Sequence, residues 1–162
     1  MAGPLTPEEA VRRLRSDPSQ ADVVRDSYLE ASPVEAARRF AGSGEFAEVM
    51  RLVGDRVRGG VVVDLGAGRG IASYAFADSG AAQVYAIEPD PSADIGRGAI
   101  PGLPAEGPIE LVDAVGESLP LADDSIDLFY ARQVLHHTTR LDDVLCEAAR
   151  VLRPGGALLA CR

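Results

Sequence analysis

A glycine-rich turn is the feature of this sequence most suited to holding a small molecule. The stretch VVVDLGAGRG, residues 61–70, is an apolar run that ends in Asp64 and continues into Gly66, Gly68 and Gly70. Glycines let a ligand approach the backbone and tolerate a positive φ in the turn. Dinucleotide sites use the same device, so the turn alone does not identify the ligand. Its G-x-G-x-G spacing nevertheless differs from the dinucleotide G-x-G-x-x-G.

Two acidic residues indicate the charge of that ligand. Asp64 ends its strand two residues before the first glycine, where it would repel a pyrophosphate and attract an ammonium or sulfonium group. Glu88 ends the next apolar run, 22 residues after Gly66, where a carboxylate can accept both hydroxyls of an adenosine ribose. Together they favour a ligand with a cationic amino-acid end and a ribose. In the alternative, Asp64 only caps the turn and Glu88 is a solvated strand end.

His136 and His137 are the only histidines, and both follow the fourth apolar run at the edge where such sheets bind ligands. Either could act as a general base near neutral pH, and a packing or positioning role is the alternative. Arg132 could pair with a carboxylate or solvate a loop. Asp127, at the start of the same run, is expected to be structural.

The remaining reactive side chains exclude several other kinds of chemistry. All sixteen basic residues are arginines, so no Schiff-base lysine, P-loop lysine or Tyr/Lys reductase pair is available within this chain. Cys146 and Cys161 fit no zinc spacing, so we expect no metal site. We expect both cysteines to be small buried apolar residues.

Short apolar runs that alternate with helical segments must position these residues. Strands are expected at 61–63, 83–87, 109–112, 126–130 and 157–160, with helices at 71–77, after Pro91 and at 141–152. Residues 153–156, Arg-Pro-Gly-Gly, should end the last helix. Strands joined through helices require crossovers, which predicts a parallel sheet with helices on both faces and ligands beyond its carboxyl ends.

The first 57 residues are expected to be helical. A capping box, Thr6 to Glu9, opens one helix, Pro18 opens another that runs through Tyr28, and Ser32 precedes a third. Helical spacing of apolar residues predicts a fourth over 45–53. We therefore divide the chain into a helical lead-in or lid, residues 1–57, and a ligand-binding domain, residues 58–162.

Charge and hydropathy narrow the choice of partners. The formal net charge of −9 disfavours nucleic acid, because such binding depends on basic groups that meet phosphates. No apolar run is long enough to cross a membrane, and the N-terminus lacks the basic start and apolar stretch of a signal peptide. We expect a cytoplasmic protein, and the absence of Lys and Asn indicates a GC-rich, bacterial coding sequence.

The order of these motifs resembles the class I S-adenosylmethionine-dependent methyltransferases, most closely their small-molecule branch, over residues 58–162. The resemblance is carried by six stretches: 61–70, 87–90, 119–121, 125–128, 134–137 and 151–156. It implies an α/β, Rossmann-like doubly wound sheet of strand order 3-2-1-4-5, S-adenosylmethionine as the cofactor and a small-molecule methyl acceptor.

The same resemblance implies a role for each part of the site. Asp64 and the turn would hold the methionine part, Glu88 and its neighbour would hold the ribose, the loop after the third strand would contact the adenine, and the backbone after the fourth strand would face the amino group. The implied cofactor-binding residues are Asp64, Gly66, Ala67, Gly68, Gly70, Glu88, Pro89, Asp113, Ala114 and Ala131. The candidate catalytic residues remain His136 and His137.

Two departures from the family pattern stand out. The usual Asp-Ala-Glu-x-Leu-Pro run is two residues longer here, from Asp113 to Pro120, which leaves the adenine contact of Asp113 open. The family core has seven strands, whereas this chain ends after the fifth. We therefore expect a fragment of a longer methyltransferase, or a homodimer paired through the edge of the fifth strand.

Three classes of function remain open. They are a small-molecule methyltransferase, a module or truncated relic that binds the cofactor without catalysis, and a nicotinamide-dependent reductase. Asp64, the glycine spacing and the missing lysine disfavour the reductase.

Overall fold

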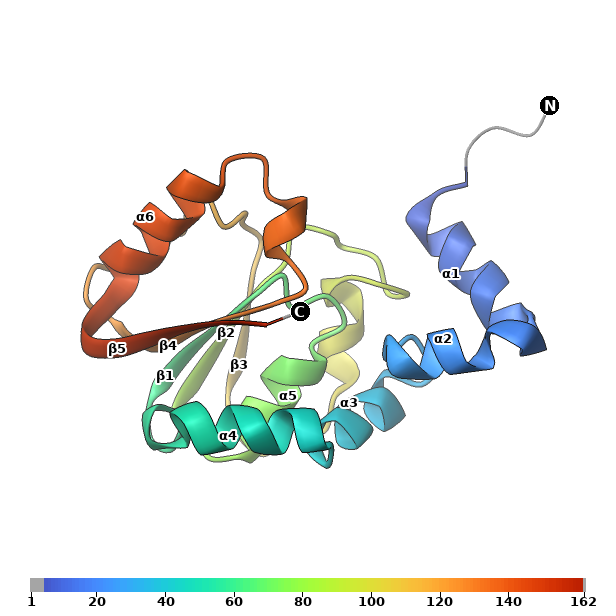
Figure 1. Ribbon diagram of the computed structural model, residues 1–162, viewed down its shortest axis with the longest axis horizontal. Coiled ribbons are helices and arrows are strands. Elements are labelled where there is room, and N and C mark those ends of the chain that lie inside the picture. Colours follow the sequence, from blue (N-terminus) through green and yellow to red (C-terminus); the bar gives the residue numbers. More distant parts are fainter. Residues whose placement is uncertain (1–4, 162) are drawn as a thin grey trace.

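A five-stranded parallel sheet organises the protein (Figure 1). The computed structural model describes residues 5–161, in which the strand order is β3-β2-β1-β4-β5. The strands are β1 (Val61–Leu65), β2 (Gln83–Ile87), β3 (Ile109–Val112), β4 (Ile126–Arg132) and β5 (Leu152–Cys161). The predicted Rossmann-like α/β fold and its strand order are confirmed.

Helices cover both faces of the sheet, as the alternation of runs predicts. The α-helices are α1 (Pro7–Ser16), α2 (Ala21–Asp26), α3 (Pro33–Ala41), α4 (Gly44–Val57), α5 (Ile71–Asp78) and α6 (Leu141–Val151), and the 3₁₀ turns are η1 (Pro18–Gln20), η2 (Arg97–Gly102) and η3 (Leu135–His137). Figure 1 shows α3, α4 and α5 beneath the sheet, α6 on the opposite face, and α1 and α2 projecting to one side. Two buried apolar clusters, one on each face, form the core.

A row of aromatic rings joins the N-terminal helices to the sheet. The rings of Tyr28, Phe40, Phe46, Phe76 and Tyr130 follow one another with centroid separations of 5.3, 5.4, 5.4 and 5.0 Å. Contacts at these separations stabilise aromatic pairs beyond the burial of their area. The helices before β1 therefore share the core of the sheet. The division of the chain at residue 57 into a lead-in or lid and a ligand-binding domain stays a prediction.

Helix starts follow the capping signals closely. In the Thr6 capping box, the Glu9 amide donates to Thr6 Oγ1 over 3.2 Å and the Thr6 amide donates to Glu9 Oε2 over 2.8 Å. Ser32 and Ser43 accept the amides of Glu35 and Phe46 in the same way. These bonds satisfy amides that would otherwise have no partner in the first helical turn.

Three expected elements differ from the observed ones. The helix opened by Pro18 begins as the turn η1 and ends at Asp26, because Tyr28 has a φ of +55° that no α-helix accommodates. The helix after Pro91 is replaced by η2, whose Gly98 and Pro101 disfavour α-helix. Strand β5 begins at Leu152 rather than at residue 157. Leu152 pairs with Ile126 and Ala157 with Leu128, so residues 153–156 lie where the pairing with β4 shifts its register.

The expected burial of Cys146 is wrong, and two other side chains, Asp127 and Arg132, have partners in the structure. Cys146 is exposed rather than buried, since it lies on the outer side of α6, whereas Cys161 is half-buried beside the Tyr130 hydroxyl. Asp127 accepts the Val61 amide over 2.7 Å, which agrees with its expected structural role. Arg132 pairs with Glu45 of α4 over 2.6 Å. Within residues 5–161 no helix has the length and apolar character to cross a membrane.

Candidate functional site

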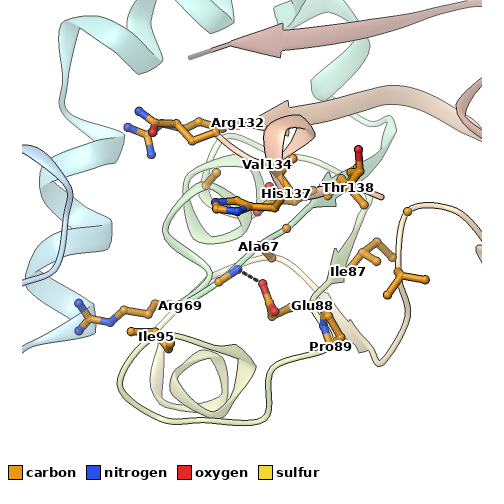
Figure 2. A pocket seen from close by; sticks show the side chains of 18 of the residues that line it. Ala67, Arg69, Ile87, Glu88, Pro89, Ile95, Arg132, Val134, His137 and Thr138 are labelled. Carbon is orange, nitrogen blue, oxygen red and sulfur yellow. Dashed lines mark hydrogen bonds between the residues drawn. The ribbon is translucent and has the colours of Figure 1, made fainter. Parts of the chain in front are cut away.

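A cavity of about 750 Å³ opens at the carboxyl edge of the sheet, where β1, β2 and β4 end (Figure 2). Its walls come from the glycine turn, the segments after β2, β3 and β4, and the residues between α2 and α3. Of the predicted site residues, the cavity is lined by Asp64, Gly66, Ala67, Gly68, Glu88, Pro89, Ala114 and His137. The fold thus brings most of them together.

The glycine turn has the left-handed backbone that its sequence predicts. Gly66, Gly68 and Gly70 have φ values of +66°, +52° and +77°. At Gly66 a Cβ would lie 2.3 Å from Val134 Cγ2, so a side chain there has no space. The amides of Gly66 and Ala67 donate to the Ile87 carbonyl over 2.9 and 3.0 Å. These contacts hold the turn open toward the cavity.

Asp64 is a buried acid at the floor of the cavity. The residue is 2% exposed, and Ser73 Oγ donates to its Oδ2 over 2.6 Å. Burial raises the pKa of Asp64 to about 6, against the opposing effects of the Ser73 hydrogen bond and the Arg132 charge. Since burial makes this carboxylate costly to ionise, a bound cation would stabilise its charged form.

Glu88 is held in place by two backbone amides. Gly68 donates to Glu88 Oε2 over 2.8 Å, the dashed contact in Figure 2, and Asp90 donates to Oε1 over 2.9 Å. Each carboxylate oxygen has a further lone-pair site, so the group can still accept hydroxyl donors. The Glu88 side chain is therefore oriented before any ligand arrives.

The wall after β3 is formed by the residues that lengthen the family pattern. Ala114, Val115, Gly116 and Glu117 line the cavity, whereas the side chain of Asp113 is 68% exposed and pairs with Arg97 over 2.7 Å outside it. Glu117 Oε1 accepts the Thr139 amide over 3.0 Å and the Thr139 hydroxyl over 3.1 Å. This wall is thereby tied to the loop that follows η3.

The two histidines are in unequal positions. Both are exposed on η3 with ring centroids 4.0 Å apart, but only His137 lines the cavity, below Arg132 in Figure 2.

Two other predicted residues do not line the cavity. Gly70 precedes the first turn of α5, and Ala131 is buried in β4 beside Leu65.

Sequence reasoning missed one wall of the cavity. Ser27, Tyr28 and Leu29 line it from the α2–α3 connection, and Arg69 lines it from within the glycine turn. For Ser27, Tyr28 and Leu29, the only indication in the sequence is the predicted lid role of residues 1–57. Arg69 lies between Gly68 and Gly70, and no local pattern marks it as a cavity residue. No group of His, Cys, Asp and Glu residues suited to a metal ion occurs within residues 5–161.

The comparisons with known proteins agree with this geometry. The family described as "Methyltransferase domain" matches residues 63–160. An uncharacterized methyltransferase of Mycobacterium ulcerans is 39% identical over 103 residues, which cover 64% of this chain and 39% of the relative. The chain thus spans well under half the length of that curated relative.

Two solved structures share the fold. A protein from Methanococcus maripaludis superposes with a TM-score of 0.66 over 99% of this chain and 66% of its own, at 17% identity. An S-adenosylmethionine-dependent methyltransferase from Mesorhizobium loti has a TM-score of 0.61 and 26% identity, over 74% of this chain and 53% of its own. With its family match, strand order and glycine turn, the chain belongs to the class I S-adenosylmethionine-dependent methyltransferases, and S-adenosylmethionine is the cofactor of that family.

Proposed function

We propose that this chain binds S-adenosylmethionine through Asp64, the glycine turn and Glu88, and takes part in methyl transfer to a small-molecule acceptor. The observation that supports this most is the meeting of a buried acid and an oriented carboxylate in one cavity. The buried acid suits a cationic amino-acid end, and the oriented carboxylate suits a ribose.

The residues of the cavity fit the cofactor without a metal or a nucleophilic side chain. S-adenosylmethionine supplies a methyl group that is already activated by a sulfonium leaving group. The chain then needs to hold the acceptor in line with that methyl group and to exclude water, and orientation of this kind can lower a barrier by up to roughly 7–11 kcal/mol. Glu88, tied to two amides, supports such a rigid arrangement.

His137 is the histidine that we propose as general base for the acceptor. It lines the cavity, whereas His136 does not. Its exposed position on η3 leaves the ring able to approach a group bound between the glycine turn and the loop after β4. In the alternative, both rings serve only to hold η3 in place.

A cofactor-binding module without catalysis is the second candidate function. It is supported by the share of 39% that the chain covers of its curated relative, since acceptor walls can come from the rest of a longer protein. A nicotinamide-dependent reductase is disfavoured, because the buried Asp64 would face a pyrophosphate.

Glu88 provides the test. S-adenosylhomocysteine, the demethylated cofactor, should bind to the wild type in calorimetry, and Glu88→Ala should weaken that binding by about 1–3 kcal/mol. Glu88→Gln retains one acceptor oxygen and should lose less. Glu106→Gln, an exposed change away from the cavity, is the matched control. Unchanged affinity in Glu88→Ala, or tighter binding of NAD, would contradict the assignment.

A further inference from the structure

The hydroxyl of Tyr28 is a donor in the cavity wall that has no partner among residues 5–161. The residue is 7% exposed and lines the cavity from the α2–α3 connection. Its amide donates to the Arg25 carbonyl and its carbonyl accepts Arg69 Nη1, each over 3.1 Å, whereas its hydroxyl makes no hydrogen bond within the described chain. The hydroxyl keeps contact with open space, which for a residue of this wall is the cavity. A largely buried side chain with a free donor is suited to meet a ligand there.

The Tyr28 ring is held in place by the residues around it. Its φ of +55° lies in the left-handed region, which a bulky side chain rarely adopts. The ring packs edge-on against Phe40 at a centroid separation of 5.3 Å, and the guanidinium carbon of Arg39 lies 4.1 Å from its centroid. Residues in such backbone conformations persist where the surrounding contacts fix them, and they gather at ligand sites. The hydroxyl is therefore positioned before any ligand binds.

Arg132 supplies a second free donor beside Tyr28. It lines the cavity from the end of β4, and its guanidinium carbon lies 5.2 Å from the centroid of the Tyr28 ring. Its Nε and Nη2 donate to the two oxygens of Glu45 over 2.6 and 3.2 Å, so this carboxylate balances its charge. Its Nη1 makes no hydrogen bond within residues 5–161. Two elements thus offer one O–H and one N–H group to the same part of the cavity, without an excess charge.

This part of the cavity lies away from the carboxylate that we assign to the ribose. Figure 2 shows Arg132 at one end of the view and Glu88 at the other, with His137 between them. Under the proposed function, His137 is the base for the methyl acceptor. The Arg132 end of the cavity is therefore where the rest of that acceptor would lie.

We propose that Tyr28 and Arg132 bind a neutral carbonyl oxygen of the methyl acceptor and thereby select the substrate. The inference rests on the proposed function, since it concerns the acceptor in the same cavity. A carbonyl oxygen has two lone pairs, so it can accept the Tyr28 hydroxyl and Arg132 Nη1 together. A carboxylate suits this place less well, because Glu45 already balances the charge of Arg132 and a further buried charge is costly. The acceptor class is therefore a molecule that carries a ketone, ester or amide group.

Nuclear magnetic resonance titrations of the protein saturated with S-adenosylhomocysteine test this inference without the natural acceptor. The probes are acetophenone, which carries a neutral carbonyl, benzoate, which carries a carboxylate, and toluene, which has no oxygen. Acetophenone should bind to the wild type more tightly than toluene or benzoate. Tyr28→Phe should weaken acetophenone binding about three- to tenfold and leave toluene within about twofold.

Two further variants accompany Tyr28→Phe. Arg132→Lys keeps a positive charge beside Glu45 but removes Nη1, so it should also weaken the binding of acetophenone and not that of toluene. Tyr74→Phe is the matched control, because Tyr74 of α5 is equally buried at 7% and does not line the cavity. It should leave the binding of all three probes unchanged.

Several outcomes overturn the inference. They are acetophenone that binds to the wild type no better than toluene, an equal loss of both probes in Tyr28→Phe, and no loss of either. Tighter binding of benzoate than of acetophenone would overturn the choice of a neutral carbonyl. Weaker binding of S-adenosylhomocysteine to Tyr28→Phe would assign the hydroxyl to the cofactor instead.

Failure of the wild type to bind S-adenosylhomocysteine would contradict the proposed function and is distinguishable from these outcomes. The same titrations with the ligand-free protein would then still test the two donors. A loss of acetophenone alone in Tyr28→Phe would support the carbonyl site, and an equal or absent loss would overturn it.

Discussion

Binding of the cofactor should be linked to loss of a proton from Asp64. Burial raises the pKa of this group to about 6, and the charged groups that face it are Arg132 at the end of β4 and Glu88 after β2, with Ser73 of α5 as its hydrogen-bond donor. A bound ammonium or sulfonium favours the ionised carboxylate and lowers its pKa. The affinity for S-adenosylhomocysteine should therefore rise as the pH rises from 5 to 7.

The size of the effect follows from the pKa. With a pKa of about 6, roughly nine-tenths of Asp64 is protonated at pH 5 and roughly one-tenth at pH 7. If the bound form stays ionised throughout, the dissociation constant should be about tenfold larger at pH 5 than at pH 7. At pH 6 each binding event should release about half a proton.

Calorimetry in two buffers of different ionisation enthalpy measures the released proton directly. Asp64→Asn should release none, and its affinity should be weaker at pH 7 and flat between pH 5 and 7. The double change of His136 and His137 to Gln is the control to be measured beside it, because it removes both imidazoles and leaves Asp64 in place. It should keep the proton release of the wild type.

The stability of the ligand-free protein provides an independent check. Because the folded-state pKa of Asp64 lies above its ordinary value of 3.8, its contribution to stability is present below about pH 4 and is lost as the pH rises through about 6. Asp64→Asn removes that loss. The free energy of unfolding of the variant minus that of wild type should therefore be about 1–3 kcal/mol larger at pH 7 than at pH 4. Proton release that persists in Asp64→Asn, or an affinity that falls between pH 5 and 7, would refute this reasoning.

Two further predictions concern the histidines and the sheet edge. In a form with a known acceptor, His137→Gln should lower turnover and leave S-adenosylhomocysteine affinity nearly intact. His136→Gln should change neither quantity. If the two single variants turn over equally, the pair has a packing role. Strand β5 is an unpaired edge of the sheet within residues 5–161, and its Leu158 is 41% exposed. Light scattering over a concentration series should therefore detect association through this edge. A stable monomer whose β5 amides resist hydrogen exchange would contradict this expectation.

Local sequence signals predicted most of the elements and the part of the cavity formed by the glycine turn and the strand ends. The capping residues at Thr6, Ser32 and Ser43 mark helix starts because their side chains bond amides only three residues away. Apolar runs separated by helical segments are compatible with few topologies other than a parallel sheet, whose carboxyl ends must share one edge. That is why Asp64 and Glu88, 24 residues apart in the sequence, could be placed in one site.

Contacts between distant segments decided the rest. Nothing in the short-range pattern distinguishes His137 from His136, or shows that Asp113 turns outward to Arg97, because side-chain direction in irregular segments depends on the packing around them. The same holds for Tyr28, which has a positive φ, contacts Phe40 and accepts a hydrogen bond from Arg69, a residue 41 positions further along the chain.

Residue types and spacing are enough to predict the α/β class, the glycine turn and the two acids, because each of these features is made within a single strand-turn-helix unit. Which charges are paired follows only from the folded protein. Asp94 pairs with Arg12 and Arg15 of α1, and Glu30 pairs with Arg39 of α3. Burial and pairing are properties of the assembled core, because electrostatic cost depends on which groups surround a charge rather than on which residues precede it.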